Sequence, residues 1–292
     1  MKLPSTTLTI ILLSTPFFMF AQSPVNGFMQ PKGHGSVVLS HNFESYNSVF
    51  LVPKKVEGVP IFNEIKVNST SVYTTYGLSD KLNVILNVPY IKAEGAASEQ
   101  VLKNLNYTNT QRGLQDVSVY VKYNALTVES DKRTFSLVGA FGVKTPLGDY
   151  SVDDGLQTIV AIGNRATSVN ALAIGLLRDN SGFFVSGQAG YCVRNKQVPD
   201  AMMSELKIGL IKPRFYVDAL IAHQTSLGGT DILADGFQGF FPSTKVNYTR
   251  IGLNIFIPIY GQFGLCTGAS TYIAGRNLGQ STSVYGGISC SF

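Results

Sequence analysis

Two runs of alternating apolar and polar residues, joined by a tight turn, constrain this chain more than any other feature. In the run after the turn, Leu82, Val84 and Leu86 share one face. Lys81 and Asn83 share the other face. A period of two is that of a β-strand with one apolar and one mainly polar face. Strands of soluble proteins usually have about 5–6 residues, whereas a strand that crosses a membrane needs roughly 9–11. The pattern therefore predicts a membrane-spanning hairpin.

Segments of the same kind recur down to the last residue. They give about twelve strands, an even number, as bacterial single-chain barrels have. We predict strands at Gly35–Tyr46, Asn68–Leu78, Lys81–Lys92, Asp116–Leu126, Arg133–Thr145, Thr167–Leu177, Gly182–Arg194, Met202–Ile211, Phe215–Thr225, Lys245–Ile259, Gln262–Ala274 and Gln280–Phe292. One of them, Thr167–Leu177, is apolar on both faces, which predicts that the interior is packed beside it.

The connections between these strands alternate between short and long. The short turns lie around Ser79, Asp131, Asn180, Pro213 and Tyr260. The longer connections are Asn47–Val67, Ala93–Gln115, Pro146–Ala166, Asn195–Ala201 and Ser226–Thr244, with the brief Gly275–Gly279 last. This phase predicts an all-β fold, an antiparallel transmembrane β-barrel with short periplasmic turns and longer extracellular loops. A soluble β-sandwich is the alternative, but it has no reason to keep such a phase.

The composition agrees with a membrane barrel. Charged residues make up 14% of the chain, against about a quarter in soluble domains, and no stretch after the first segment has the roughly 20 apolar residues of a membrane helix. The net charge of +5 comes from scattered residues, so nucleic acid is not indicated as a partner. Trp is absent, so aromatic residues at the membrane interfaces must be Tyr and Phe. The sequence calls for no cofactor.

The N-terminal residues resemble an export signal. Lys2 provides a positive start, Leu8–Phe20 a hydrophobic centre, and Ala21 a small residue before a cleavage site. We therefore predict a signal peptide over residues 1–21, a barrel domain over residues 22–292 that begins with a short leader, and a location in the bacterial outer membrane.

The last residue, Phe292, occupies an outward position of the last strand. A terminal aromatic residue resembles the end of outer-membrane barrels. It predicts that the last strand pairs with the first and is recognised by the barrel-assembly machinery, with outer-membrane lipid as the other partner. The three cysteines do not form a disulfide framework. Cys266 and Cys290 fall on neighbouring strands but opposite faces, and Cys192 is read as a small apolar residue of the sheet.

Three stretches together resemble the outer-membrane family known as the MetA-pathway of phenol degradation proteins. The first is the turn Tyr76-Gly77-Leu78-Ser79-Asp80 followed by Val88-Pro89-Tyr90. The second is Gly113-Leu114-Gln115-Asp116-Val117 leading to Lys122-Tyr123, and the third is Lys144-Thr145-Pro146-Leu147-Gly148-Asp149. The resemblance is specific in the first half of the chain and generic after Arg194.

The family resemblance implies a barrel found with aromatic-degradation genes that passes hydrophobic small molecules. It implies no catalytic residues. We interpret the quoted motif positions as structural: Gly77 and Gly148 for backbone conformation, and Asp80 and Asp149 for turn capping.

Enzymatic and metal sites find little support in the residues. His34-Gly35-Ser36 is the only His-x-Ser sequence, and it falls at the periplasmic end of the first strand, away from the rim where a phospholipase would act. His223 and Asp218 face opposite sides of one strand by parity. A loop with Asp149, Asp153 and Asp154 offers oxygen ligands of the kind that calcium prefers, although an acidic solvated loop is the commoner reading. We predict that the chain is not an enzyme.

Ionisable residues on the strands mark the expected functional surface. Charges in a membrane strand are tolerated where water reaches them. The candidate lumen-lining residues are Asp116, Lys122, Lys144, Arg194, Lys207, Asp218 and Arg250. They either line a path or form salt bridges that fill the barrel. The first hypothesis is a channel that passes small hydrophobic or aromatic solutes by diffusion. The alternative is a closed barrel that acts as a surface scaffold or adhesin, with its working part in the loop at 93–115 and a Gly- and aromatic-rich tract at 228–241.

Overall fold

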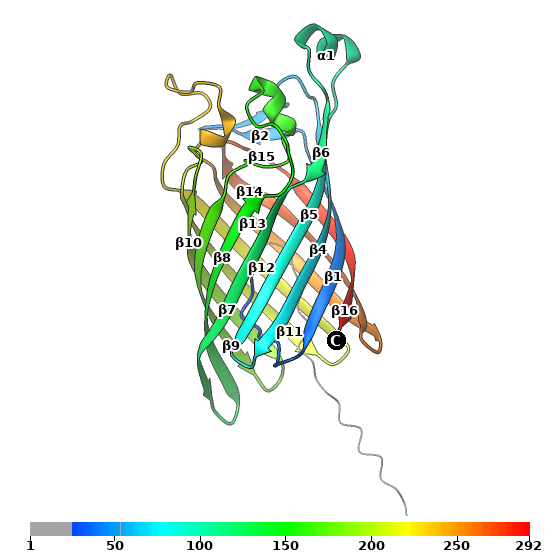
Figure 1. Cartoon of the computed structure of the whole chain (residues 1–292), viewed down its shortest axis with the longest axis vertical. Coiled ribbons are helices and arrows are strands. Elements are labelled where there is room, and N and C mark those ends of the chain that lie inside the picture. The colour runs from blue at the N-terminus through cyan, green and yellow to red at the C-terminus, as the bar shows by residue number, and fades with distance from the viewer. Residues whose placement is uncertain (1–24, 53) are drawn as a thin grey trace, which may run out of the picture.

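A computed structural model describes residues 25–52 and 54–292 as one closed β-barrel with its loops gathered at one end (Figure 1). The predicted signal peptide lies outside these residues. In the described part the main sheet has 13 strands, of which twelve form the barrel and one, β6, extends the edge of β5. The barrel strands are β1 (Gly35–Tyr46), β4 (Ile65–Ser79), β5 (Leu82–Gly95), β7 (Asp116–Glu129), β8 (Arg133–Pro146), β9 (Ser168–Asp179), β10 (Phe183–Arg194), β11 (Ala201–Lys212), β12 (Phe215–Ser226), β13 (Asn247–Tyr260), β14 (Phe263–Arg276) and β16 (Thr282–Ser291). The predicted fold class is confirmed.

The barrel closes through the two ends of the chain, as predicted from Phe292. Strand β1 pairs antiparallel with β4 on one side and with β16 on the other. The amide of Gly35 donates to the carbonyl of Phe292 at 2.8 Å, and the amide of Phe292 donates back at 2.9 Å. Closure leaves no unpaired strand edge, which a lipid environment requires because it offers no water to satisfy backbone groups.

Alternation along each strand separates an inner from an outer face. In β7 the inward Asp116, Ser118 and Tyr120 are buried, whereas the outward Val119 and Val121 are exposed. Barrel strands have 10 to 15 residues, enough to cross a bilayer when tilted. The outward apolar residues therefore form the lipid-facing belt. Aromatic residues are exposed near the short-turn rim: Tyr76, Phe183, Phe215, Tyr260, Phe263 and Phe292. Such a girdle is typical of the membrane interface.

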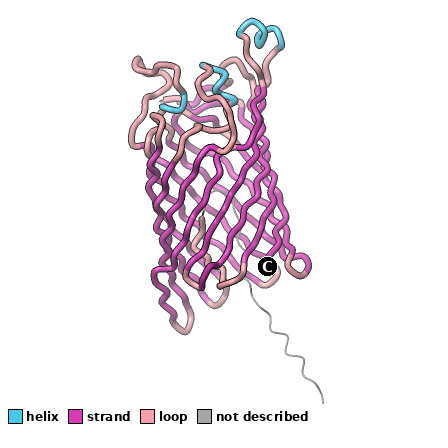
Figure 2. Tube along the Cα trace, in the orientation of Figure 1, coloured by secondary structure: helices cyan, strands magenta, loops and turns pink. Residues whose placement is uncertain are grey.

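The long connections are more ordered than the sequence predicted. All of them lie at one rim, where Figure 2 shows every helix and most of the loops. Strands β2 (Ser48–Phe50), β3 (Lys55–Glu57) and β15 (Leu278–Gly279) form a separate three-stranded sheet there. Expecting only loops over 47–67 and 275–279 was therefore wrong. The signal was missed because strands of two or three residues are too short to show a period.

The connection between β5 and β7 was also expected as a loop and is not one. It contains α1 (Glu99–Leu105) and β6 (Thr110–Leu114), which pairs with β5 and lifts the helix above the barrel (Figure 1). Ser98 caps α1 by accepting from the amide of Val101, as Ser commonly does at a helix start. Two 3₁₀ turns, η1 (Gly155–Val160) and η2 (Phe241–Ser243), lie in the other long connections. No helix of the described residues is long and apolar enough to cross a membrane.

Candidate functional site in the barrel lumen

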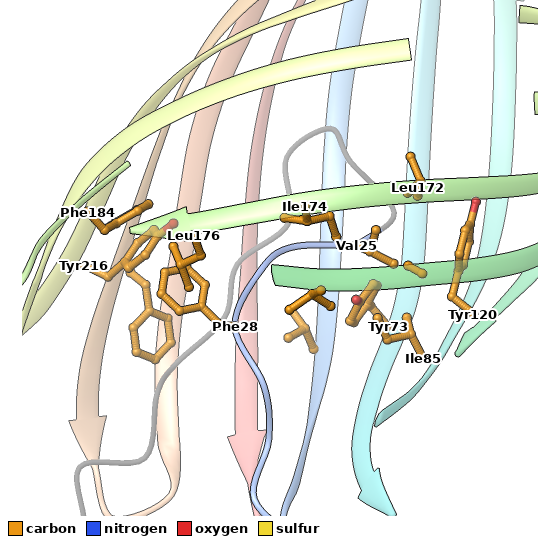
Figure 3. Close-up of a cluster of buried hydrophobic side chains, with 14 of the residues drawn as sticks. Val25, Phe28, Tyr73, Ile85, Tyr120, Leu172, Ile174, Leu176, Phe184 and Tyr216 are labelled. Atoms are coloured by element: carbon orange, nitrogen blue, oxygen red, sulfur yellow. The ribbon is translucent and has the colours of Figure 1, made fainter. Parts of the chain in front are cut away.

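The segment before β1 lies inside the barrel and fills its lower half, near the short-turn rim. Val25 and Phe28 are buried in one apolar cluster with inward side chains of the strands. The ring of Phe28 meets that of Phe184 edge-on at 5.2 Å and that of Tyr216 at 6.3 Å between centroids. Figure 3 shows Val25 beside Ile174, and Phe28 facing Phe184 and Tyr216. We call residues 25–32 the plug segment. The sequence analysis treated this stretch only as a leader.

The wall around the plug segment is mainly apolar. The inward side chains of β9, Leu172, Ile174 and Leu176, are all buried in the cluster. This confirms that the interior is packed beside the strand that is apolar on both faces. Large inward residues of other strands complete the cluster, among them Tyr73, Ile85, Tyr120, Phe184, Tyr216 and Phe256. The lower lumen is thus lined mainly by apolar side chains, with Asn83 and Lys122 among them, whereas the interior of porins is polar.

Polar groups of the wall hold the backbone of the plug segment. The ammonium of Lys122 donates to the carbonyl of Asn26 at 3.1 Å and to that of Phe28. The side-chain amide of Asn83 accepts from the Gln30 amide at 2.7 Å and donates to the Gln30 carbonyl at 2.9 Å. These bonds satisfy backbone groups that would otherwise be buried without partners. No barrel strand pairs with the plug segment over its described residues.

The turn of the family-like motif, residues 76–80, contacts the end of the plug segment. The carboxylate of Asp80 accepts from the amide of Lys32 at 2.9 Å, so turn capping does not describe its role. A Cβ added at Gly77 would lie 2.1 Å from the carbonyl oxygen of Pro31. Glycine is therefore required at position 77 by the close passage of the chain, since Gly77 is not among the glycines with a positive φ.

The same correction applies to the other family-like loop. A Cβ at Gly148 would lie 2.1 Å from the carbonyl oxygen of Leu114. The carboxylate of Asp149 accepts from the guanidinium of Arg165 at 2.5 Å, so it forms an ion pair across the loop. Both positions depend on residues distant in the sequence, which a local reading of the turn does not include.

Above the plug segment the lumen opens into a cavity of about 790 Å³. Its lining is mixed: serines and asparagines of β1, β4, β5 and β7 on one side, and tyrosines and arginines of β10, β13 and β14 on the other. It meets the apolar cluster at Tyr73 and Tyr120. It reaches the long-loop rim, where Pro242 and Leu278 contribute to its lining. We call this space the upper cavity.

The seven candidate residues all lie on the inner side of the wall but in different settings. Four line the upper cavity: Asp116, Lys144, Arg194 and Arg250. Lys122 holds the plug segment. Lys207 lies 3.6 Å from Glu205, with both side chains buried. Asp218 is buried and accepts from the Tyr216 hydroxyl at 2.6 Å and the Asn254 amide at 2.8 Å.

An ion pair at the mouth fixes the loop that follows β8. The ammonium of Lys144 lies 3.4 Å from Asp116, and the Tyr150 hydroxyl donates to the same carboxylate at 2.5 Å. Burial and the bond to Asp116 raise the pKa of Tyr150, so its hydroxyl keeps its proton and remains a donor at neutral pH. Tyr150 also belongs to an apolar cluster with Phe62 and Ile162, which forms part of the roof.

A second clamp fixes the connection between β12 and β13. The guanidinium of Arg276 donates to both carboxylate oxygens of Asp231, at 2.8 and 2.5 Å, and the Asn277 amide adds a bond of 2.8 Å. The hydrogen bond from Arg276 is the largest effect on Asp231 and lowers the pKa of its carboxyl to about 2. The roof of the upper cavity is therefore tied to the end of β14.

The other candidate residues from the sequence, those for a hydrolase or a metal site and the cysteines, do not come together in one site within the described residues. His34 and Ser36 lie at the short-turn rim, and the Ser36 hydroxyl is buried with no hydrogen-bond partner among the described residues, so the pair lacks the contact a hydrolase needs. His223 faces outward and bonds to Thr225 and Thr249, as strand parity predicted. Over the described part of the chain, no three His, Cys, Asp or Glu side chains gather as a metal site, so Asp149, Asp153 and Asp154 form no such group. All three cysteines are free.

Comparisons with known proteins bear on the fold. No family profile matches the chain, and no curated protein matches it. Among solved structures, the COG4313 outer membrane channel from Pseudomonas putida F1 is similar, with a TM-score of 0.72 and 13% identity over 93% of this chain and 100% of that one. The NalP autotransporter translocator domain from Neisseria meningitidis has a TM-score of 0.49 and 10% identity, covering 88% of each chain. Outer membrane phospholipase A from Escherichia coli has 0.40 and 10%, covering 89% of this chain and 91% of that one.

A TM-score below 0.5 does not establish a shared fold, so the first of these structures alone informs the architecture. At 13% identity that similarity concerns the fold and not the solute. Together with the closed sheet and the apolar outer belt, it identifies the chain as a twelve-stranded β-barrel of the bacterial outer membrane.

Proposed function

We propose that this barrel is an outer-membrane channel that admits small hydrophobic or aromatic solutes by diffusion. The apolar lower lumen carries the proposal. Inward side chains such as Ile85, Ile174, Phe184 and Phe256 are each at most 2% exposed while the plug segment is in place. An apolar solute would gain from burial there. A polar solute would lose its hydration and find few replacement hydrogen bonds, such as those that Asn83 and Lys122 make with the plug segment.

The plug segment is the barrier on this path. A solute that enters by the long-loop rim reaches the upper cavity and then meets Val25 and Phe28. The segment is held by side-chain hydrogen bonds and apolar packing, without the ladder of backbone bonds that fixes the strands. Local opening requires only that those contacts break, so the plug segment is the part of the lower lumen that can move at least cost.

The sequence motifs support a finer assignment within this proposal. The turn at 76–80 and the stretches at 113–123 and 144–149 resemble the MetA-pathway of phenol degradation family, which implies aromatic solutes. The similar structure from Pseudomonas putida F1 is named an outer membrane channel. We also propose outer-membrane lipid around the apolar belt and recognition by the barrel-assembly machinery through β16 and Phe292, whose side chain is 54% exposed.

A surface scaffold is the second candidate. The connection between β12 and β13 stands at the long-loop rim and exposes Leu233 at 66%, which offers a surface partner an apolar contact. Deleting residues 232–240 tests this candidate: loss of cell-surface binding with unchanged solute uptake would favour the scaffold over the channel.

The channel proposal is tested by conductance and uptake together. We expect a small single-channel conductance for the whole chain in planar bilayers and a several-fold larger one after deletion of residues 25–31. We also expect slower uptake of an aromatic hydrocarbon by cells that lack the protein. Deletion of α1 is the control, since the helix stands above the barrel and none of its residues lines the upper cavity. A folded barrel that stays silent after the deletion, with unchanged uptake in cells, would refute the proposal.

A further inference from the structure

Two guanidinium groups line the upper cavity and form no ion pair within the described part of the chain. Arg194 donates to the carbonyl of Pro199 at 3.1 Å and to the side-chain oxygen of Gln224 at 3.3 Å, both uncharged. Arg250 reaches only the Tyr272 hydroxyl, at 3.5 Å, and its Nε is buried with no partner. Among the described residues no carboxylate lies within 4 Å of either group.

The carboxylates nearest to this region are already engaged. Glu44 accepts from the Ser281 hydroxyl at 2.5 Å, and Asp116 is shared by Lys144 and Tyr150. Glu205 pairs with Lys207 on its own strand and lies close enough to Arg250 to interact with its charge. Asp200 accepts from the backbone amide of Arg194 at 2.8 Å and from the Tyr191 hydroxyl at 3.1 Å. On the wall formed by β10 and β13, the charged side chains that line the upper cavity are thus both cations, Arg194 and Arg250.

Two tyrosines hold the guanidinium of Arg250. Its Cζ lies 5.2 Å from the ring centroid of Tyr272 and 6.0 Å from that of Tyr248. The two rings meet edge-on, 5.2 Å apart at 75°. Contact with the electron-rich ring faces favours a cation there and fixes the plane of the guanidinium group. The fork of N–H donors is thus presented in one orientation.

The two arginines belong to one surface. Arg194 contacts Gln224 of β12, which lies opposite Tyr248 of β13 in the sheet. Tyr248 in turn lies against Arg250. The chain of contacts runs from β10 to β14 along the same side of the upper cavity, and all four of these side chains line it.

We propose that this surface binds the carboxylate of a solute whose apolar body lies in the upper cavity. A guanidinium group matches a carboxylate with two parallel hydrogen bonds, and a cation removed from water without a partner is unfavourable until an anion arrives. The apolar body finds Tyr248 and Tyr272 beside the arginines, and Tyr73 and Tyr120 where the cavity meets the apolar cluster. The inference rests on the proposed channel and narrows its solutes to hydrophobic carboxylic acids.

Calorimetric titration of the folded chain in detergent tests this inference. The probes are 4-phenylbutanoate, its uncharged amide and inorganic phosphate, at fixed salt concentration. We expect the carboxylate to bind at least tenfold more tightly than the amide or phosphate. Arg250→Gln should remove that preference, and Arg194→Gln should reduce it. Arg214→Gln, which removes the same charge from an exposed turn, should leave it unchanged.

The outcomes separate this inference from the channel proposal. Equal binding of acid and amide by the unchanged protein, or phosphate binding as tight as the acid, would overturn the inference whether or not a variant folds. Liposome flux of the amide reports the channel independently, because the amide carries no charge. Flux of the amide without a binding preference for the acid would support the channel proposal and refute the carboxylate site. A binding preference for the acid that depends on Arg250, without flux of the amide, would support the carboxylate site and refute the channel proposal.

Discussion

The lower and upper halves of the lumen are built from the same twelve strands, but the lower half is filled by the chain and the upper half contains a cavity. The lower half buries Val25 and Phe28 against apolar wall residues and leaves little open space. The upper half keeps a cavity of about 790 Å³ with charged and hydroxyl groups on its wall. The difference follows the plug segment: where the chain itself fills the barrel the wall is mainly apolar, and where a cavity remains the wall is mixed.

This contrast also separates two kinds of buried charge. In the lower half Lys122 donates to two backbone carbonyls and the Asn26 side-chain oxygen of the plug segment. In the upper half Arg250 is held by ring faces and has an unused N–H group. A cation that holds the protein's own chain has a structural role, whereas one whose hydrogen bonds are incomplete is suited to a ligand.

Removing the hydrogen bonds that hold the plug segment in the lower half should have the largest effect on its docking. Lys122→Met fills a similar volume but donates no hydrogen bond, which leaves carbonyls of Asn26 and Phe28 buried without a donor. Hydrogen bonds to a charged group contribute about 1.5–3 kcal/mol, so we expect docking of the plug segment to weaken by about 2 kcal/mol. Hydrogen exchange of residues 26–31 and the open fraction in bilayers measure this.

Lys81→Met is the matched control, because Lys81 is exposed in the turn after β4. Docking as tight in Lys122→Met as in the unchanged protein would mean that the desolvation of the ammonium cancels its hydrogen bonds. Packing alone would then hold the segment.

A smaller effect is expected from crowding the same contact. A Cβ at Gly27 would lie 2.9 Å from the Cβ of Leu176, too close for either backbone to keep its place. Overpacking of a buried contact costs about 1–3 kcal/mol, so Gly27→Ala should raise the conductance by partial release of the plug segment. A Cβ at Gly139 would meet nothing within 4 Å, so Gly139→Ala should leave the conductance unchanged. Equal conductance of the two variants would contradict the assigned packing.

The roof of the upper half should respond least. Asp231→Asn removes the ion pair with Arg276, which is partly exposed and therefore contributes about 1 kcal/mol or less. We expect faster proteolysis of residues 232–240 with an unchanged thermal midpoint of the barrel. Asp235→Asn, at an exposed position of the same loop, is the control. Rates that do not differ between the two variants would show that the clamp does not hold the roof.

The same clamp should depend on pH. The pKa of Asp231 is lowered to about 2 by Arg276, against about 3.9 for a free Asp. A lowered pKa means that the stabilisation is complete above pH 4 and is lost as the pH falls toward 2. Protection of the loop in hydrogen exchange should follow that course, and protection that is constant down to pH 2 would argue against the ion pair.

The period-two pattern of the sequence predicted the barrel fold, because the pattern depends only on neighbouring residues. Each strand alternates along its own length, as Asp116 to Tyr120 do, and the phase of short and long connections repeats regardless of what fills the barrel. The predicted boundaries of β1 agree with the structure, and those of β7 and β8 agree at their first residues. The sequence also indicated a packed interior beside β9, since Leu172, Ile174 and Leu176 are apolar where a water-filled lumen requires polar residues.

The remainder of the site depends on contacts between distant residues. Lys122 meets Phe28 across 94 positions of the chain, and Asn83 meets Gln30 across 53. Val25, Phe28 and Met29 could have been noticed as apolar residues in a leader that otherwise consists mainly of polar residues, Gly and Pro. That pattern alone does not say whether such a segment lies in the lumen or outside it.

The sequence by itself determined the twelve-stranded barrel, its inner and outer faces and the rim at which the long connections gather. The physical reason is that alternation and turn length are properties of neighbouring residues. The tertiary structure alone decided which inward charges hold the protein's own chain and which face open space. A side chain's parity sets its face, but its partners depend on the plug segment and on strands far away in the chain.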